Sequence, residues 1–175
     1  MDFPAAPEWS TSEWFNTPEP LSLGCLRGQV VVLHAFQMLC PACVSHALPQ
    51  AQRLAAATRG AGVAVIGLHT VFEHHDAMTV TALRAFLHEY RIHFPVGVDV
   101  HSEHGGDIPQ TMRAYGMQGT PTTVLIDADG GLRQQWFGVV DELTLGIEIG
   151  RLLATAPPVT TTADTASACS SSDCT

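Results

Sequence analysis

Two neighbouring stretches decide how this chain folds: Val30-Val31-Val32-Leu33-His34-Ala35-Phe36 and, after two intervening residues, Leu39-Cys40-Pro41-Ala42-Cys43. An apolar, β-branched run of this length predicts a buried strand. Residues 41–58 predict a helix, because Pro41 suits a first helical turn and Ala, Leu, Gln and Arg dominate afterwards. Cys40 is therefore expected where the strand ends and the helix begins, with Cys43 one turn inside the helix.

This position favours thiol chemistry. The unpaired N–H groups and the positive dipole end of a helix N-terminus favour a thiolate, so we expect the pKa of Cys40 to be lowered. A thiolate with a second thiol three residues later can attack a disulfide and then be released by its neighbour. Two inert buried thiols and a structural zinc site are the alternatives. Zinc needs four ligands, and the only other close cysteine pair is Cys169 and Cys174, near the C-terminus.

Composition narrows the class of protein. The 175 residues are 46% hydrophobic and 14% charged, and the net charge of −9 rests on eight arginines and no lysine, which argues against nucleic-acid binding. No apolar run approaches the roughly 20 residues of a membrane span. The N-terminus lacks the basic and apolar regions of a signal peptide, so a cytoplasmic protein is expected, or a periplasmic one if a leader has been trimmed.

The chain divides into three parts. Residues 1–20 contain four prolines and two tryptophans, and predict an extended arm laid over the domain. Residues 21–155 form the domain, and within it Cys25 is expected to be a small buried hydrophobe. Residues 156–175 are rich in Pro, Thr, Ser and Ala and predict a disordered tail. Cys169 and Cys174 would be either a mobile dithiol within that tail or cysteines without a specific role.

The remaining elements follow from periodicity and turn signals. Residues 63–68 predict a second strand, parallel to the first in a β-α-β unit, and Pro49 predicts a kink in the helix between them. Helices are expected at 81–91 and 109–115, a short strand at 94–100 and an antiparallel hairpin from strands 122–127 and 132–139. A last helix is expected at 141–154, with Leu143, Ile147 and Leu152 as its core contacts.

The stretch Gly119-Thr120-Pro121-Thr122-Thr123 makes Pro121 a candidate cis proline, since it follows a glycine and directly precedes a strand. Together with residues 30–43 and 115–127, it resembles the thioredoxin-fold proteins. The similarity is closest to the TlpA-like thiol–disulfide oxidoreductases of the AhpC/TSA-related redoxin group. The resemblance implies an α/β, thioredoxin-like fold in which helices flank a central mixed β-sheet. Residues 77–98 would form a helix–strand insertion.

The resemblance also implies a site and an activity. Cys40 would be the exposed nucleophile and Cys43 the resolving thiol of a Cys-Pro-Ala-Cys motif that includes Pro41 and Ala42. Pro121 would be cis and stacked on the pair, and Thr120 would offer its backbone to a substrate. The redox-active disulfide would serve without another cofactor. A disulfide-bearing protein or small thiol would be the substrate, and an unidentified electron donor would be a further partner. The protein would act in cell redox homeostasis.

The chain departs from the family pattern at several positions. Leu39 replaces the usual aromatic residue before the first cysteine. His34 stands where thioredoxins have a buried acid, and is expected either to relay protons or to be a neutral core residue. Glu73 either matches an acid near the disulfide of some relatives or is a solvated loop carboxylate.

Two other functions compete with disulfide exchange. Thiol-dependent peroxidases of the peroxiredoxin-like group place a proline seven residues and a hydroxyl three residues before the reactive cysteine, where this chain has Leu33 and Gln37. A non-catalytic binding module or metal chaperone would use the thiols and neighbouring histidines as ligands. The histidines that cluster in two loops match no metal-binding spacing, so no bound metal is expected; they are His69, His74, His75, His101 and His104.

Overall fold

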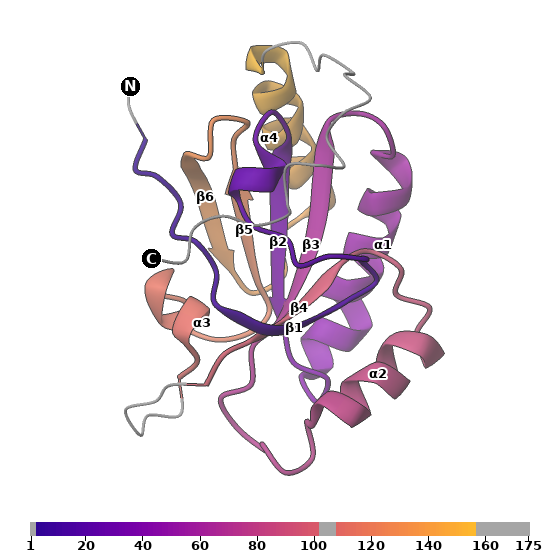
Figure 1. Cartoon of the computed structure of the whole chain (residues 1–175). Coiled ribbons are helices and arrows are strands. Elements are labelled where there is room, and N and C mark those ends of the chain that lie inside the picture. The colour runs from indigo at the N-terminus through magenta and orange to yellow at the C-terminus, as the bar shows by residue number, and fades with distance from the viewer. Residues whose placement is uncertain (1–2, 102–107, 157–175) are drawn as a thin grey trace.

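The central strand of the fold is β2 (Val30–Phe36), and every one of its residues is buried. The computed structural model describes residues 3–101 and 108–156, in which six strands form one mixed sheet in the order β1-β4-β3-β2-β5-β6 (Figure 1). The other strands are β1 (Thr11–Phe15), β3 (Val63–His69), β4 (Val96–Asp99), β5 (Thr122–Ile126) and β6 (Leu132–Phe137).

Strand directions agree with the sequence prediction. β2 pairs in parallel with β3 and antiparallel with β5, and β5 and β6 form the expected antiparallel hairpin. β3 also pairs in parallel with β4, which reaches the sheet after the helix α2 (Val80–Glu89). The α/β, thioredoxin-like fold with a helix–strand insertion is therefore confirmed.

Side chains of β2 alternate between two apolar layers. On one face of the sheet, Val30, Val32 and Phe36 pack in the layer covered by α1 (Leu48–Ala57), α2 and α4 (Glu142–Thr155). Val31 and Leu33 face the layer covered by α3 (Gln110–Ala114) and by the N-terminal segment. Both sides of the strand are buried because helices and the N-terminal segment cover both faces of the sheet.

The helix after Cys40 begins at Pro41 and passes through a π-helical segment, η2 (Cys43–Ala47), before α1. The backbone N–H of Leu48 donates to the carbonyl of Cys43, five residues earlier, at the end of this segment. Pro49 has no N–H to donate to the carbonyl of Ser45, and its ring would collide with that carbonyl in a regular helix. Where the sequence predicted a kink, the structure has a π-helical segment just before the proline.

The N-terminal arm contributes a strand, which the sequence did not predict. Ala5 forms a bridge with Gly131 beside β6, and further along β1 pairs antiparallel with β4 at the opposite edge of the sheet. Between them Trp9 is buried and donates a 2.6 Å hydrogen bond to the carbonyl of Leu21. The arm therefore crosses one face of the sheet and joins the sheet at its far edge.

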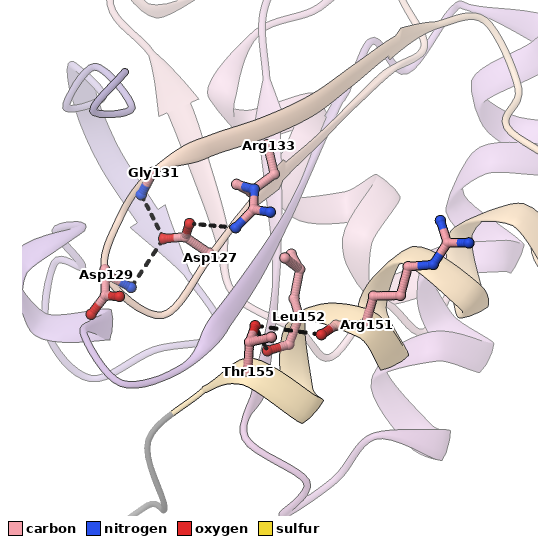
Figure 2. A network of polar contacts seen from close by, with 7 residues as sticks. All are labelled: Asp127, Asp129, Gly131, Arg133, Arg151, Leu152 and Thr155. Carbon is pink, nitrogen blue, oxygen red and sulfur yellow. Dashed lines mark hydrogen bonds and ion pairs between the residues drawn. The ribbon is translucent and has the colours of Figure 1, made fainter. Parts of the chain in front are cut away.

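Asp127 organises the turn between β5 and β6. Its carboxylate accepts hydrogen bonds from the backbone N–H groups of Asp129 at 3.0 Å and Gly131 at 2.7 Å, and pairs with Arg133 at 3.1 Å (Figure 2). In the same view, the hydroxyl of Thr155 donates to carbonyls of the last turn of α4.

The burial predictions for three residues are wrong. Leu143 and Ile147 are 72% and 46% exposed, whereas the residues of α4 that enter the core are Leu145, Ile149 and Leu152. Cys25 is exposed, in the short 3₁₀ turn η1 (Gly24–Leu26), where its sulfur lies 3.3 Å from the hydroxyl of Ser22. The expected tail, with Cys169 and Cys174, lies outside the described residues. In the part of the chain that is described, no helix is both long and apolar enough to cross a membrane.

Candidate functional site

Cys40 and Cys43 are joined in a disulfide at the end of β2, and their Cα atoms lie 5.2 Å apart. The two sulfurs differ in environment because Cys40 is partly exposed, whereas Cys43 is 0% exposed within the apolar layer under α1. Leu39, directly before the pair, is 56% exposed. An incoming molecule can therefore reach the sulfur of Cys40 but not that of Cys43.

One backbone donor points at the sulfur of Cys40. The N–H of Cys43 points at this sulfur over 3.2 Å, and the chain around it is the first turn of the helix that begins at Pro41. In a reduced protein the same N–H would donate to a Cys40 thiolate, which a hydrogen-bond donor and a helix N-terminus both stabilise. The local sequence alone produces this arrangement.

The peptide bond between Thr120 and Pro121 is cis, as predicted. The carbonyl oxygen of Thr120 lies 3.5 Å from the sulfur of Cys40. Gly138 donates its backbone N–H to the carbonyl of Pro121 at 2.8 Å. The cis-proline loop is thus held against the disulfide on one side and against the end of β6 on the other.

Gln37 is a site residue whose role the sequence did not indicate. It is 1% exposed, and its amide nitrogen donates to the hydroxyl of Thr120 over 3.5 Å. Its amide oxygen has no hydrogen-bond partner within the described part of the chain. The signal available in the sequence was a polar residue between an apolar strand and the cysteine motif. The sequence could not show that this residue reaches a loop 83 residues away.

His34 lies in the middle of β2 and is buried. Its Nδ1 is 3.2 Å from the hydroxyl of Thr123 on the neighbouring strand, and its Nε2 has no partner among the residues described. Burial removes water from the ring, which penalises the charged form and lowers the pKa of His34 to about 4. The imidazole is therefore neutral at pH 7.

The other candidate residues do not gather at the disulfide as one group. Glu73 is exposed in the loop after β3, and within residues 3–101 and 108–156 it forms no hydrogen bond or ion pair. His69 is buried against Phe36, with a ring-centroid distance of 5.3 Å, and burial lowers its pKa to about 4. His75 and His101 meet edge to face at 4.9 Å. His104 lies outside the described residues.

Metal ligands are likewise not assembled in what the structure describes. Over residues 3–101 and 108–156, no three or more His, Cys, Asp or Glu side chains are placed to hold a metal ion. The binding-module alternative therefore has no ligand set in that part of the chain.

A disulfide at a strand-to-helix junction, set against a cis-proline loop on a mixed sheet, defines the class of thioredoxin-like dithiol proteins. Residues 5–135 match the model of the AhpC/TSA family, and the chain belongs to this family.

Comparison with known proteins agrees with this assignment. The chain is 56% identical to the thioredoxin-like superfamily protein SPOA0173, covering 88% of this chain and 99% of that one with a TM-score of 0.85. It is 49% identical to a thiol-disulfide isomerase from Corynebacterium glutamicum, covering 85% and 97% of the two chains with a TM-score of 0.80. It is also 29% identical over 147 residues to the protein DipZ of Mycobacterium tuberculosis, covering 83% of this chain. The chain spans only 20% of the length of DipZ.

Proposed function

We propose that this protein is a thiol–disulfide oxidoreductase that works through Cys40 and Cys43. The observation that carries the proposal is the contrast between the two cysteines: Cys40 is partly exposed beside the cis-proline loop, and Cys43 is fully buried. The similarity of this chain to a thiol-disulfide isomerase, over nearly the whole length of the isomerase, supports the same activity.

In this proposal the reaction passes two electrons from the dithiol to a substrate disulfide. The Cys40 thiolate attacks one substrate sulfur, a mixed disulfide forms, and the other substrate sulfur leaves as a thiolate that takes up a proton. The Cys43 thiolate then attacks the sulfur of Cys40 and releases the second substrate thiol. The product is the Cys40–Cys43 disulfide, and an external dithiol must reduce it before the next turnover.

The surrounding residues have supporting roles in the proposal. The carbonyl of Thr120 and the ring of Pro121 would position the substrate chain beside Cys40, while Pro41 and Ala42 hold the helix start. His34, which is neutral at pH 7, is available to accept a proton, whereas Glu73 is exposed and forms no hydrogen bond or ion pair within the described residues. In this proposal no cofactor is required, because the Cys40–Cys43 dithiol itself carries the two electrons.

The partner and the compartment are the finer parts of the proposal. A disulfide-bearing protein or a small thiol compound would be the substrate, and an electron donor of unidentified nature would complete the cycle. We propose the cytoplasm as the compartment, with the periplasm as the alternative. A reduction potential of about −270 mV, that of thioredoxin, would suit a cytoplasmic reductant. A potential of about −120 mV would suit an oxidant outside the cytoplasm.

The test uses two single variants with a protein disulfide as substrate. Cys40→Ser should abolish reduction, and Cys43→Ser should accumulate a mixed disulfide that peptide mass mapping locates at Cys40. If the Cys40→Ser variant still reduces the substrate, the proposal is wrong.

The rate of hydrogen peroxide consumption distinguishes this proposal from the peroxidase alternative. Gln37 and Leu33 occupy the places of the hydroxyl and the proline of a peroxide pocket, and Leu33 is fully buried in the core. We therefore expect slow, thiol-dependent peroxide consumption and rapid disulfide reduction by the same preparation. The reverse order of rates would favour the peroxidase.

A further inference from the structure

The helix α4 is apolar on two faces, and the sheet covers only one of them (Figure 1). The uncovered face carries Leu143 and Ile147, which are 72% and 46% exposed, together with the exposed small residues Gly150 and Ala154. These four residues are spaced by four, three and four positions, which places them in one row along the helix. A surface helix ordinarily carries polar residues on its outer face.

Two glycines inside α4, Gly146 and Gly150, have no steric explanation among the described residues, and only Gly150 lies in the row. Its φ is not positive, and a Cβ atom built on it would meet no other atom within 4 Å. Glycine in a helix interior weakens the helix relative to alanine. A glycine that nothing nearby requires is useful where another helix approaches the backbone closely.

The row is complementary to itself in size. Its N-terminal half holds the two large residues, Leu143 and Ile147, and its C-terminal half holds Gly150 and Ala154. When two such helices pack antiparallel, Leu143 of each faces Ala154 of the other, and Ile147 faces Gly150. One twofold axis satisfies all these contacts, because in a symmetric dimer the same patch serves both copies.

Charges on the flank of the row are complementary as well. Arg151 and Glu148 lie on the same side of the row and form an ion pair within the chain. A twofold axis perpendicular to both helices brings this side of each helix to the same side of the interface. Arg151 of one copy therefore comes beside Glu148 of the other. The Arg151 side chain is 70% exposed, so it can turn toward the second copy with little loss.

We propose that a second copy of this chain covers the exposed face of α4, with the two α4 helices packed antiparallel. The row of Leu143, Ile147, Gly150 and Ala154 is the centre of this α4 interface. The two Arg151–Glu148 contacts lie along one side of it. The proposal does not depend on the redox activity, because none of these residues belongs to the disulfide site.

The test is sedimentation equilibrium of the full chain at concentrations up to about 500 µM, in a reductant that removes any disulfide between chains. The chain mass is 18.7 kDa, and the wild-type protein should approach twice this value. Leu143→Gln and Gly150→Gln should each raise the dimer dissociation constant roughly tenfold or more, the first by removing a large residue and the second by crowding Ile147.

Tyr90→Gln is the matched control, because Tyr90 is a large, 50% exposed residue at the end of another helix, α2. It should leave the dissociation constant unchanged. Arg151→Glu should weaken the dimer, and combining it with Glu148→Arg should restore it. Circular dichroism of each variant shows whether the monomer has folded.

A wild-type protein that stays at 18.7 kDa throughout the range would overturn the proposal. So would a dimer that Leu143→Gln and Gly150→Gln leave intact, or one that Tyr90→Gln dissociates, since the interface would then lie elsewhere.

Discussion

The sulfur of Cys40 lies 3.5 Å from the carbonyl oxygen of Thr120, although 80 residues separate them in the chain. The contact exists because β2 and β5 are neighbours in the sheet, so the residues at the end of one strand and before the other meet. Cys43, which is fully buried, is screened from approaching molecules. This contact makes Cys40 the sulfur that an incoming disulfide would meet first.

The difference in exposure predicts an order of chemical modification. In the fully reduced protein, iodoacetamide should alkylate Cys40 well before Cys43, because only the Cys40 sulfur is accessible. Quenching at short times and mapping peptides by mass spectrometry would measure both rates. Faster labelling of Cys43 would mean that the assignment of nucleophile and resolving thiol is reversed.

Gly67→Ala should destabilise the domain. A Cβ at this position in β3 would approach side-chain atoms of Val96 at 3.0 Å, Phe94 at 3.1 Å and Phe36 at 3.3 Å. Overpacking of this kind costs about 1–3 kcal/mol of unfolding free energy. Urea denaturation would measure it, and Gly24→Ala, where the nearest atom is a serine oxygen at 3.5 Å, is the control that should change little.

Asp127 should contribute to stability through its acceptor oxygens more than through its charge. Asp127→Ala leaves the N–H groups of Asp129 and Gly131 and the guanidinium of Arg133 without their acceptor, at a cost of about 1–3 kcal/mol. Asp127→Asn keeps an oxygen for the two N–H groups and should lose about 1 kcal/mol. Equal losses in the two variants would show that the ion pair with Arg133 dominates instead.

The two buried histidines predict loss of stability in acid. Burial lowers the pKa values of His34 and His69 from 6.5 to about 4, so the unfolded chain binds protons first as the pH falls. The free energy of unfolding should therefore decrease between about pH 6.5 and pH 4, by an amount on the order of 3 kcal/mol for each histidine.

Urea denaturation at several pH values, compared between wild type and the single variants His34→Gln and His69→Gln, would measure this effect. Each variant should lose the contribution of one histidine, on the order of 3 kcal/mol across this pH range. Asp99, whose pKa burial raises, acts with the opposite sign, but it is present in all three proteins and cancels in the comparison. A variant whose pH dependence equals that of wild type would show that the histidine it replaces does not titrate differently on folding.

Local sequence was enough for the elements with a strong pattern. The uniform apolar run of β2 and the proline at the helix start place the cysteines correctly, and the glycine-rich turn after Asp127 predicts the hairpin. In α4 the pattern was ambiguous, because apolar residues stand at positions 143, 145, 147 and 149 and two different faces fit. We predicted the wrong face. The packing of α4 against β2 and β5, which brings Leu145 and Ile149 onto Val30 and Leu125, selects the other one.

By itself, therefore, the sequence determined the two cysteines at the helix start, the cis proline and the class of fold. The cysteines and the proline depend on residues that are close together in the chain, where turn and helix preferences act directly, whereas the class of fold followed from the resemblance to thioredoxin-fold proteins. Only the tertiary structure decided which distant groups contact the cysteines and the cis-proline loop. The contact of Thr120 with Cys40, the link from Gln37 to Thr120 and the pairing of β1 with β4 join segments far apart in the sequence. Their partners are set by the order and register of the strands, which no local pattern specifies.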